Sequence, residues 1–520
     1  MGSLRDDLAR DAERVWETHI SWVFARGGEV FKVKKPVALG FLDFSTLPRR
    51  REACEAEVAL NARLARGVYR GVEPITRDPD GTHRLGGAGT PVEWAVRMRR
   101  LADEDRADVR LEQGLLGLDD VDRVAEHLAA FHDRCRADDA TAAFGRPEVI
   151  RGNVTENFEQ TRGVVDALLR PEQARAIEAW QLAFLEEREE LFLERVAAGR
   201  VRDGHGDLRL EHVYLEVGGE VQIIDGIEFN ERFRFADVCA DIAFLSMDLA
   251  WHGRVDLAER LLSVYAREAN DFDLYPLVDF YESYRAYVRG KVRTMLAADA
   301  GAPAEARARA RREARRYFLL ALAADRRPLL PPTLVAVGGW IAAGKSTLAD
   351  RLSAAMGAPS IATDRIRKHL LGAEPTERRF DDAFEGAYDP GVTDRVYAEV
   401  ARLARVVLDS GRPVILDASF RTQAQRAVAR RVAEDAGVPF HFVECRADPE
   451  VCRARLRERH RRESVSDGRL EIFDAFLASW EPVEDLGSGQ HHVVRTDGPV
   501  DAVVEPLRAV LPLWPPALTG

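Results

Sequence analysis

The sequence predicts two domains of different fold class, an α+β domain followed by an α/β domain with a parallel sheet. The chain has 520 residues, which is enough for two separate hydrophobic cores. Its early part shows strand-like alternation and then long helical patterns, which is typical of α+β domains. After residue 333, short apolar runs alternate with helical stretches, which is the pattern of a parallel α/β sheet.

The chain begins with a predicted β-hairpin. Ile20–Phe24 and Val30–Lys34 are strand-like runs on either side of a turn at Arg26–Gly28. The alternation places Lys32 and Lys34 on one face of the second strand. An inward-facing lysine pair is unfavourable unless it meets an anion, and a solvated strand face is the alternative.

A mostly helical region follows the hairpin. A helix is predicted over 45–61, and it places Glu57 where the carboxylate could turn back toward the lysine strand. After another strand at Trp94–Met98, apolar residues at helical spacing predict helices from Asp119 onward and over 171–198. A β-rich start with a helical body indicates a domain of two lobes.

Two aspartates further along the chain are candidates for a catalytic site. Asp207 lies in the tight loop His205-Gly206-Asp207, and Asp225 follows a predicted hairpin that turns at Gly218-Gly219. The hairpin could bring the two carboxylates together, one as a proton-accepting base and the other as a metal ligand. A surface loop is the alternative for this pattern taken alone.

A change in composition marks the boundary between the two domains. Residues 304–316 form a run rich in Ala, Arg and Glu, which predicts a solvated helix rather than a basic arm for RNA. The proline-rich stretch after it predicts a stiff linker. The predicted domains are therefore 1–325 and 333–520, joined by a linker at 326–332.

A glycine-rich motif opens the second domain. Gly339 and Gly344-Lys345-Ser346-Thr347 have the spacing of a phosphate-binding P-loop, with a strand-like run before them and helix formers after them. Glycines allow backbone N–H groups to surround a phosphate, and the helix N-terminus adds partial positive charge. Lys345 would reach the β- and γ-phosphates of a nucleotide, and Ser346 would hold Mg²⁺. A plain glycine turn is the alternative.

Polar residues follow the predicted strands of this domain at the sheet edge where ligands bind. The predicted strands are Leu334–Val337, Ser360–Ala362, Val414–Leu416, Phe440–Glu444 and His492–Arg495. Asp364 and Arg367 follow the second strand, and Asp417 ends the third as a Walker-B-like or substrate-binding carboxylate. Arg455 and Arg459 belong to a run of arginines that could face a phosphate, with a plain charged helix as the alternative.

The first domain resembles the aminoglycoside-phosphotransferase-like branch of the protein-kinase fold. The resemblance is carried by His-Gly-Asp and by the aspartate after a short hairpin. It implies that Asp207 is the catalytic base and that Asp225 binds metal. It also implies that Lys32 contacts the α- and β-phosphates of ATP, with Glu57 as its helix partner. Lys34 shares the strand face and is the alternative lysine.

The first domain departs from the family pattern at one metal-binding position. The family usually has asparagine five residues after the base, whereas this chain has His212. Imidazole is a poorer Mg²⁺ ligand than a carboxamide oxygen. We therefore expect His212 either to be a weak metal ligand or to hydrogen-bond a phosphate.

The second domain resembles P-loop kinases of the AAA-33 and zeta-toxin type, which phosphorylate hydroxyls on nucleotides, sugars or polynucleotide ends. The resemblance implies that Asp364 activates the acceptor hydroxyl and that Arg455 and Arg459 lie in a lid over the nucleotide. Arg367 and Asp417 then fall on the substrate side. The fold class expected is thus an α+β two-lobed protein-kinase-like domain followed by an α/β P-loop kinase domain with a parallel sheet.

The two resemblances together predict a bifunctional kinase that uses ATP and Mg²⁺ at both sites. The acceptors are expected to be small hydroxyl compounds such as sugars, aminoglycosides or nucleoside-like molecules. The alternative is a P-loop kinase or ATPase acting on a nucleotide, a polynucleotide end or a toxin-type target. In that alternative the first domain is a regulatory module that binds a nucleotide or a partner.

Composition sets limits on partners and compartment. The formal net charge of −12 argues against nucleic acid and against a membrane surface as the main partner. The five cysteines lack CxxC spacing, which predicts a reduced, cytoplasmic protein. No apolar run is long enough for a bilayer, and the acidic start is not expected to be a signal peptide. The sequence leaves the oligomeric state and the acceptors open.

Overall fold

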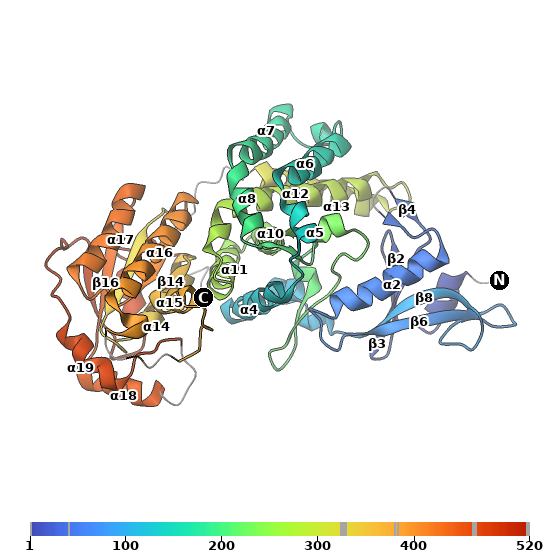
Figure 1. Cartoon of the computed structure of the whole chain (residues 1–520). Coiled ribbons are helices and arrows are strands. Elements are labelled where there is room, and N and C mark those ends of the chain that lie inside the picture. Colours follow the sequence, from blue (N-terminus) through green and yellow to red (C-terminus); the bar gives the residue numbers. More distant parts are fainter. Residues whose placement is uncertain are drawn as a thin grey trace. The chain divides into compact units, whose positions relative to one another are not determined.

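The computed structural model describes residues 3–39, 42–322, 330–378, 381, 384–459 and 465–515 (Figure 1). The chain forms two compact units: unit 1 comprises residues 1–251 and 280–322, and unit 2 comprises residues 252–279 and 323–520. The predicted linker at 326–332 lies partly outside the described residues, at 326–329. The predicted end of the first domain, at residue 325, lies outside them too.

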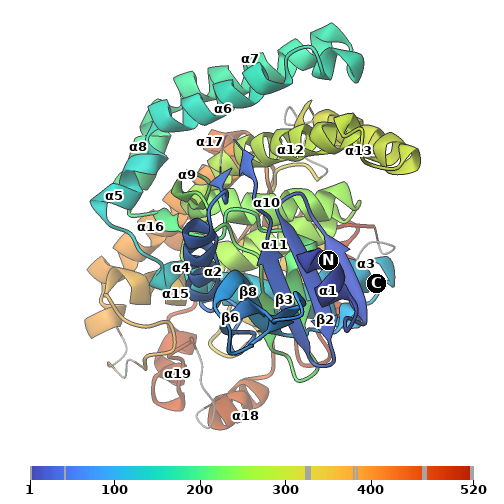
Figure 2. The same cartoon turned by 90° about the vertical axis from the view of Figure 1, so that its right-hand side faces the viewer.

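Unit 1 begins with an antiparallel sheet of six strands, in the order β1-β2-β3-β8-β6-β7 (Figure 2). The central strand β3 pairs with β2 on one side and with β8 on the other, so the predicted hairpin is confirmed. The six strands are β1 (Arg14–Glu17), β2 (Ser21–Arg26), β3 (Glu29–Lys34), β6 (Tyr69–Arg77), β7 (His83–Leu85) and β8 (Pro91–Arg99).

The alternation of β3 sends side chains to two covered faces of this sheet. Phe31 and Val33 pack into a hydrophobic core on one face. Helix α2 (Leu47–Asn61) crosses β6 and β8 on the other face. Lys32 and Lys34 share that second face, as the alternation predicts, and so point toward α2.

The rest of unit 1 is mostly helical, and Figure 2 shows α6 and α7 side by side. The helical pattern over 171–198 gives two helices rather than one, because Arg188 leaves the helical conformation. The first turn of α12 belongs to unit 2. The helices are α1 (Leu4–Ala9), α3 (Ala107–Glu112), α4 (Leu118–Arg134), α5 (Asp139–Ala142), α6 (Pro147–Thr161), α7 (Pro171–Glu187), α8 (Glu189–Ala197), α9 (Glu231–Arg234), α10 (Val238–Trp251), α12 (Tyr275–Ala298) and α13 (Ala304–Leu322).

Short strands flank the two aspartates in the region between α8 and α10. Strands β10 (Val213–Leu215) and β11 (Val221–Ile223) form the predicted antiparallel hairpin. Asp207 lies before this hairpin and Asp225 directly after it. The remaining pairs of unit 1 are β9 (Val201–Asp203) with β12 (Phe235–Asp237), and β4 (Ala38–Leu39) with β5 (Leu42–Asp43).

Unit 2 contains a parallel sheet of five strands in the order β14-β15-β13-β16-β17. All five predicted strands are confirmed. They are β13 (Leu334–Gly339), β14 (Ser360–Ala362), β15 (Val414–Asp417), β16 (Phe440–Arg446) and β17 (His491–Arg495). The P-loop strand β13 is central and buried on both faces, so its carboxyl end lies beside those of β15 and β16.

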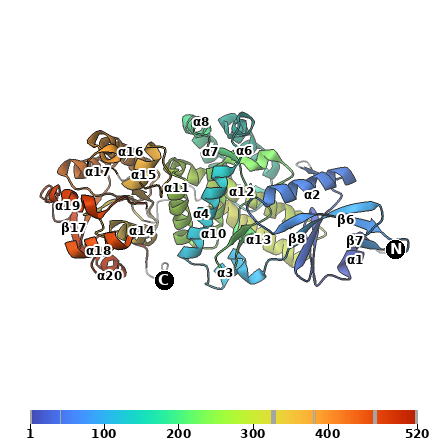
Figure 3. The same cartoon turned by 60° about the horizontal axis from the view of Figure 1, so that its bottom comes forward.

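Helices cover both faces of the parallel sheet. Helices α16 and α17 lie on one face, and α14 and α20 lie on the other (Figure 3). The helices of this unit after the P-loop strand are α14 (Lys345–Met356), α15 (Thr363–Leu370), α16 (Pro390–Asp409), α17 (Gln423–Ala436), α18 (Pro449–Arg459), α19 (Leu470–Ala478) and α20 (Asp501–Leu507).

Helix α11 (Val255–Glu268) also belongs to unit 2, although it lies far upstream of the P-loop in the sequence. Ser263 on α11 shares a hydrogen bond with Ser353 on α14, at 3.0 Å between the hydroxyl oxygens. Arg412 pairs with Glu259 on α11 at 2.9 Å. The predicted limits of 1–325 place this segment in the first domain, whereas its contacts group it with the second unit.

The predicted fold class is confirmed: a two-lobed, protein-kinase-like α+β unit and an α/β P-loop unit with a parallel sheet. Within the described ranges, no helix is long and apolar enough to span a membrane.

Candidate functional site

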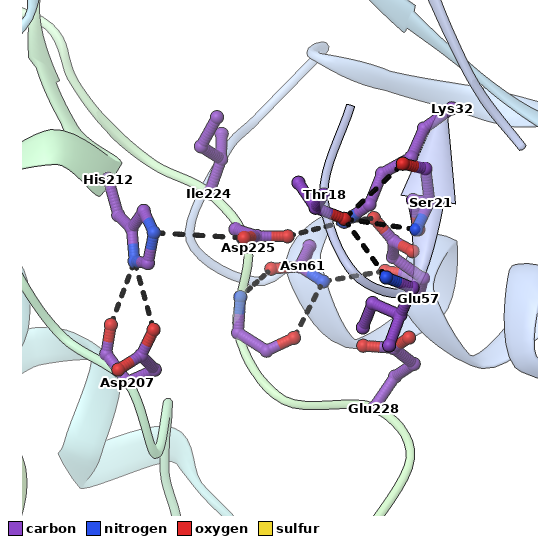
Figure 4. A network of polar contacts seen from close by, with 12 residues as sticks. Thr18, Ser21, Lys32, Glu57, Asn61, Asp207, His212, Ile224, Asp225 and Glu228 are labelled. Carbon is purple, nitrogen blue, oxygen red and sulfur yellow. Dashed lines mark hydrogen bonds and ion pairs between the residues drawn. The ribbon is translucent and has the colours of Figure 1, made fainter. Parts of the chain in front are cut away.

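The lysine strand, helix α2 and the segment after the hairpin meet in a polar network in unit 1 (Figure 4). Lys32 Nζ lies 2.9 Å from Glu57 Oε1 and also contacts Asp225 Oδ1. Burial would lower the pKa of Lys32, but Asp225 and Glu57 raise it well above its usual value. The structure therefore brings these three predicted residues together around a charged lysine.

Lys34 is held deeper in the same network. Its ammonium group contacts Glu57 Oε2 and Glu228 Oε1, and its side chain is 1% exposed. The side chain of Lys32 is 14% exposed. Glu57 thus accepts from both lysines, while Lys34 also donates to Glu228, which is itself buried.

The backbone around Asp225 is held in an unusual conformation. Asp225 has a φ of 65°, a region that residues other than glycine seldom occupy. Its N–H donates to the Tyr69 hydroxyl at 3.1 Å, and the N–H of Gly226 donates to Asn61 Oδ1 at 2.6 Å. Burial would raise the pKa of Asp225, but Lys32 and then His212 hold it well below its usual range.

The loop that carries Asp207 is anchored to helix α10. The N–H groups of His205 and Gly206 donate to the Asp241 carboxylate at 2.7 and 2.9 Å. Arg285 Nη1 donates to the Gly206 carbonyl oxygen at 3.1 Å. These bonds hold the backbone of the loop on both sides, so Asp207 has a defined position.

Both carboxylate oxygens of Asp207 are occupied by one arginine. Arg209 Nη2 donates to Oδ2 at 2.8 Å and Arg209 Nε donates to Oδ1 at 3.2 Å. Burial would raise the pKa of Asp207, but Arg209 and then His212 lower it well below the usual range. Asp207 is therefore ionised, and its proton affinity is low while Arg209 stays in place.

His212 lies between the two aspartates. Its Nδ1–H donates to the Asp207 carbonyl oxygen at 2.8 Å, which leaves Nε2 to accept from Arg209 Nη2 at 3.2 Å. Nε2 also lies 3.7 Å from Asp225 Oδ2. Burial, with Arg209 as the next cause, lowers the pKa of His212 to about 4, so the imidazole is neutral at pH 7.

The residues of this site fit a Mg²⁺ ion that arrives with a nucleotide. No group of three or more His, Cys, Asp or Glu side chains in the described part of the chain could hold a metal ion by itself. Mg²⁺ in nucleotide sites needs only one or two carboxylates, since phosphate oxygens and water complete its shell. Asp225 supplies one such carboxylate, and the neutral His212 faces the same space (Figure 4).

In unit 2, the P-loop glycines are required by the backbone. Gly339 ends β13 with a φ of 137°, and a Cβ there would lie 2.4 Å from the Cys445 carbonyl oxygen. Gly344 has a φ of 86° and caps α14, whose first residue is Lys345. Lys345 Nζ donates across the loop to the Trp340 carbonyl oxygen at 2.8 Å. The motif therefore forms a loop whose backbone N–H groups lead into a helix N-terminus.

Asp417 at the end of β15 lies beside the P-loop hydroxyl. The Ser346 hydroxyl hydrogen-bonds to its carboxylate. Burial raises the pKa of Asp417, and Lys345 opposes that effect. A P-loop hydroxyl paired with a carboxylate from a neighbouring strand is the combination that holds Mg²⁺ in P-loop enzymes, so these residues fit that ion. Ser346 and Thr347 are exposed at the start of α14.

A cavity of about 270 Å³ opens at the P-loop, entirely within unit 2. Its lining brings together Lys345, Ser346, Asp364, Arg367, Asp417 and Arg459. Asp364 lies in the first turn of α15. Burial lowers the pKa of Arg459, whereas the charges of Asp364 and Asp417 raise it. The predicted base and one predicted lid arginine therefore face the same space as the P-loop.

Arg455 lies elsewhere, although it is only four residues before Arg459. Its guanidinium donates to the carbonyl oxygens of Ala342 at 3.2 Å and Thr496 at 2.6 Å. Arg455 is not among the described residues that line the cavity. It supports the P-loop backbone, and its predicted contact with nucleotide stays a prediction.

Several residues of these sites have no sequence signal. Glu228 and Tyr69 belong to no motif, and only the fold brings them to Lys34 and Asp225. Arg421 lines the P-loop cavity from a loop without a recognisable pattern. Arg209 follows the His-Gly-Asp motif by two residues, and its position beside the candidate base is the signal by which it could have been found.

Comparison with known proteins shows the family to which the chain belongs. A family model described as an AAA domain, AAA-33, matches residues 334–483, which include the P-loop. Over 485 residues the chain is 35% identical to the uncharacterized protein Rv2004c of Mycobacterium tuberculosis and to Mb2027c of Mycobacterium bovis. The chain belongs to the family of these mycobacterial proteins. The match covers 93% of this chain and 92% of each relative, so the family shares both units.

Three solved structures are also similar to parts of the chain. A GDP complex of aminoglycoside 2'-phosphotransferase-IIIa is 14% identical and covers 59% of this chain and 93% of its own, with a TM-score of 0.37. A choline/ethanolamine kinase family protein from Mesorhizobium loti is 15% identical, covers 62% and 97%, and has a TM-score of 0.36. A sugar kinase from Janibacter is 19% identical, covers 36% and 99%, and has a TM-score of 0.28. These similarities do not identify the substrate of this chain.

Proposed function

We propose that the chain is a bifunctional, ATP-dependent phosphotransferase with one phosphate-transfer site in each unit. The observation that carries the proposal is the P-loop cavity, where Lys345, the Ser346–Asp417 pair and Asp364 face one space. The lysine–carboxylate network around Asp225 supports a second site in unit 1. In each unit, a nucleotide lysine and a candidate base come from the same compact body.

In unit 2, each polar group of the cavity has a place in an in-line transfer. Lys345 would balance charge on the β- and γ-phosphates, and Arg459 would balance the charge that develops on the transferred group. Asp364 would accept the proton of the acceptor hydroxyl as its oxygen bonds to the γ-phosphorus and the bond to the β–γ bridging oxygen breaks. Mg²⁺, held by Ser346 and Asp417, would supply positive charge at the phosphate oxygens.

In unit 1, Lys32 is the better candidate for the phosphate lysine. It contacts Glu57 and Asp225, which orient it at the edge of the network, whereas Lys34 is enclosed by Glu57 and Glu228. We assign Lys32 to the α- and β-phosphates and Lys34 to holding Glu57 in place. Asp225 would bind Mg²⁺, with His212 beside it.

Asp207 is the candidate base of unit 1, and its partner restricts when it can act. Because Arg209 donates to both carboxylate oxygens and lowers their proton affinity, Asp207 becomes a stronger base when the guanidinium turns away. The phosphate oxygens of a bound nucleotide are suitable new partners for a guanidinium. Asp207 would then recover proton affinity at the moment that the nucleotide is in place.

The acceptors are proposed to be small hydroxyl compounds in both sites. A cavity of about 270 Å³ suits a small acceptor beside the phosphates. The net charge of −12 disfavours a polynucleotide, since sustained phosphate contacts need a basic groove.

Transfer from γ-labelled ATP to a pool of metabolites tests the proposal with the full chain. Lys345→Ala should abolish one set of labelled products and Asp207→Ala another. Products that depend on Lys345 alone would support a single P-loop kinase with a nucleotide-sensing first unit. Label on RNA or DNA ends would contradict the small-molecule acceptors, and label transfer insensitive to Lys345→Ala would contradict the P-loop assignment.

A further inference from the structure

Two arginines in the P-loop cavity form no ion pair with a carboxylate in the described part of the chain. Arg367 is 5% exposed and donates to the Ala387 carbonyl oxygen at 2.6 Å and to Thr393 Oγ1 at 3.4 Å. Its buried Nε has no hydrogen-bond partner. Arg421, half-buried, also lines the cavity and forms no ion pair with any described residue.

Aromatic rings, not carboxylates, orient both guanidinium groups. Arg367 lies over the ring of Tyr388 at 4.6 Å, and Arg421 lies over the ring of Phe384 at 4.5 Å. Phe384 is itself stacked on Phe476, with 4.9 Å between the ring centroids. A ring face accepts no N–H hydrogen bond along the guanidinium edge, so the edge donors that the protein does not use can meet a planar or tetrahedral anion.

The charges along the cavity wall are unequal. The described lining includes three carboxylates, Asp350, Asp364 and Asp417, and six cations, Arg267, Lys345, Arg365, Arg367, Arg421 and Arg459. Arg267 contacts Asp350, and Arg365 contacts Glu268, so these two arginines are already paired. The charges of Lys345 and Arg459 lower the pKa of Asp417, so these two cations have a carboxylate nearby. Among the described residues, Arg367 and Arg421 have no ion-pair partner in the cavity wall, and Glu481, which is outside the lining, acts on Arg421 only through its charge.

A buried guanidinium without a counter-ion is costly to keep, unless a ligand supplies the missing anion. The nucleotide phosphates are already met by the P-loop backbone, Lys345 and Arg459 in the proposed mechanism. A neutral polyol would gain little from two charged donors, whereas an oxyanion would form charge-assisted hydrogen bonds with both.

We propose that the acceptor of the P-loop site carries an oxyanion in addition to its reactive hydroxyl, and that Arg367 and Arg421 bind this group. The oxyanion is a phosphate ester, a sulfate or a carboxylate, since all three accept from a guanidinium edge in the same way. The inference rests on the proposed phosphotransfer in unit 2 and narrows its acceptor from any hydroxyl compound to an anionic one.

Fractionating the metabolite pool before the assay tests the inference. The pool is passed over an anion-exchange resin at pH 7, and the full chain is given γ-labelled ATP with either the unbound or the retained fraction. Label transfer that depends on Lys345 should occur with the retained fraction only. Such transfer with the unbound fraction would overturn the inference. Phosphatase treatment of the retained fraction should remove the acceptor if it is a phosphate ester and spare it if it is a carboxylate or sulfate.

Variants of the two arginines connect the acceptor to this wall of the cavity. Arg421→Met and Arg367→Met should each raise the KM for the retained acceptor about 10- to 100-fold, the effect expected for a lost charge-assisted hydrogen bond. Arg431→Met, on an exposed position of α17, is the control and should leave KM unchanged. Because Arg367 is buried, Arg421→Met keeps the test valid if the Arg367 variant fails to fold. An unchanged KM in a folded Arg421→Met variant would contradict the assignment.

A binding measurement tests this inference separately from the phosphotransfer. The full chain, saturated with Mg²⁺ and a non-hydrolysable ATP analogue, is titrated with inorganic phosphate and with acetate. Wild type should bind at least one of these anions about 10-fold or more tightly than the Arg367→Met/Arg421→Met double variant. If no Lys345-dependent transfer exists but this difference is present, the phosphotransfer proposal fails and the oxyanion site stands. Equal binding by the two proteins would overturn the site whatever the transfer assay shows.

Discussion

At the scale of single residues, the contact between Arg209 and Asp207 has the largest consequence for chemistry. A base must accept a proton, yet Arg209 donates to both oxygens of Asp207 and lowers the proton affinity of this carboxylate. Both side chains are mostly enclosed, at 9% and 27% exposure, so water only partly screens the pair. The position of Arg209 therefore decides whether Asp207 is a salt-bridge partner or a base.

Replacing Arg209 by Met should raise the pKa of Asp207, because the cation that stabilises its carboxylate is gone. A base works only when deprotonated, so transfer by unit 1 should fall as pH drops through about 4, the ordinary carboxyl pKa. The measurement is the pH–rate profile of the Asp207-dependent products, taken in short assays. In kcat/KM for ATP, which reports the enzyme before the nucleotide binds and Arg209 turns away, wild type and Arg209→Lys should show no such fall at that pH. A Met variant that also shows none would mean that Asp207 is not the titrating base.

Replacing His212 by Asn should keep unit 1 active and sharpen its dependence on Mg²⁺. The asparagine amide can donate to the Asp207 carbonyl oxygen as His212 Nδ1–H does, and its oxygen is a better Mg²⁺ ligand than imidazole nitrogen. Transfer should remain within about 10-fold of wild type, and half-maximal activity should need less Mg²⁺. A complete loss of transfer with the fold intact would show that the imidazole has a chemical or phosphate-binding task of its own.

Sequence patterns identified the residues of unit 1 that stand in motifs and missed those that the fold alone supplies. Lys32, Glu57 and Asp225 follow from a strand, a helix and a hairpin in the expected order. Glu228 could not be predicted, because its partner Lys34 is 194 residues away and no local pattern joins them. The choice between the two lysines stayed open for the same reason.

At the scale of elements, β3, α2 and the segment after β11 are tied together by shared carboxylates. Glu57 on α2 accepts from both strand lysines, and Glu228 binds Lys34 from the segment after the hairpin. Glu57 and Lys34 are almost completely buried. Each lysine thus bridges carboxylates from different elements, so the sheet, the helix and the Asp225 segment hold one another in position.

We expect Lys32 to be needed for phosphate transfer and Lys34 to be needed for the stability of unit 1. Lys32→Met should abolish the unit 1 products with a modest change in stability, since Glu57 keeps Lys34. Lys34→Met should destabilise unit 1 by about 3–5 kcal/mol, because the buried Glu228 loses its cation and Glu57 keeps only Lys32. Urea unfolding of the full chain, with transfer assayed in parallel, measures both effects.

A double variant checks the reason for the Lys34 effect. Glu228→Gln removes one of the two carboxylates that Lys34 neutralises, so Lys34→Met should cost less in that background than in wild type. Equal costs in both backgrounds would show that the pair of Lys34 and Glu228 does not carry the effect. Loss of transfer in a stable Lys34→Met protein, together with an active Lys32→Met protein, would reverse the assignment of the lysines.

Elements with strong periodicity were predicted well, and the misses have physical causes. Four of the five strands of unit 2, β13 to β16, are largely buried, which makes their apolar runs distinct. The break between α7 and α8 was missed, because Arg188 is an ordinary helix former and its departure from helical geometry is set by packing. The pairing of α11 with the P-loop unit could not be predicted, because periodicity can show a buried helix face but not the element that covers it.

At the scale of the whole molecule, unit 2 is assembled from two separate stretches of chain. Helix α11 and the residues after it supply Glu259, Asp273 and Asp279, which pair with arginines on the P-loop side of the unit. Arg412 is the most enclosed of these arginines and pairs with Glu259 and Asp279, both at 2.9 Å. The P-loop body therefore depends on residues that precede it in the sequence.

Replacing Arg412 by Ala should destabilise unit 2, since two carboxylates lose a largely buried partner. The expected loss is about 2 kcal/mol, below the range for fully buried pairs because Asp279 is partly exposed. Thermal unfolding of the full chain with and without ATP measures it. Arg405→Ala removes an exposed pair with Asp409 on the same unit and should cost under about 0.5 kcal/mol. Equal effects of the two variants would indicate that α11 adds little to the stability of the P-loop body.

The two proposed sites should be silenced one at a time, because every residue assigned to each site belongs to a single unit. Asp207→Asn and Asp364→Asn each remove a candidate base while keeping the size of the side chain. Loss of a positioned general base should slow the chemical step about 10²- to 10⁴-fold. Asp207→Asn should therefore suppress one set of labelled products and spare the other, and Asp364→Asn should do the reverse. A single variant that removes all transfer would mean that only one site is catalytic or that the activity of each site depends on the other.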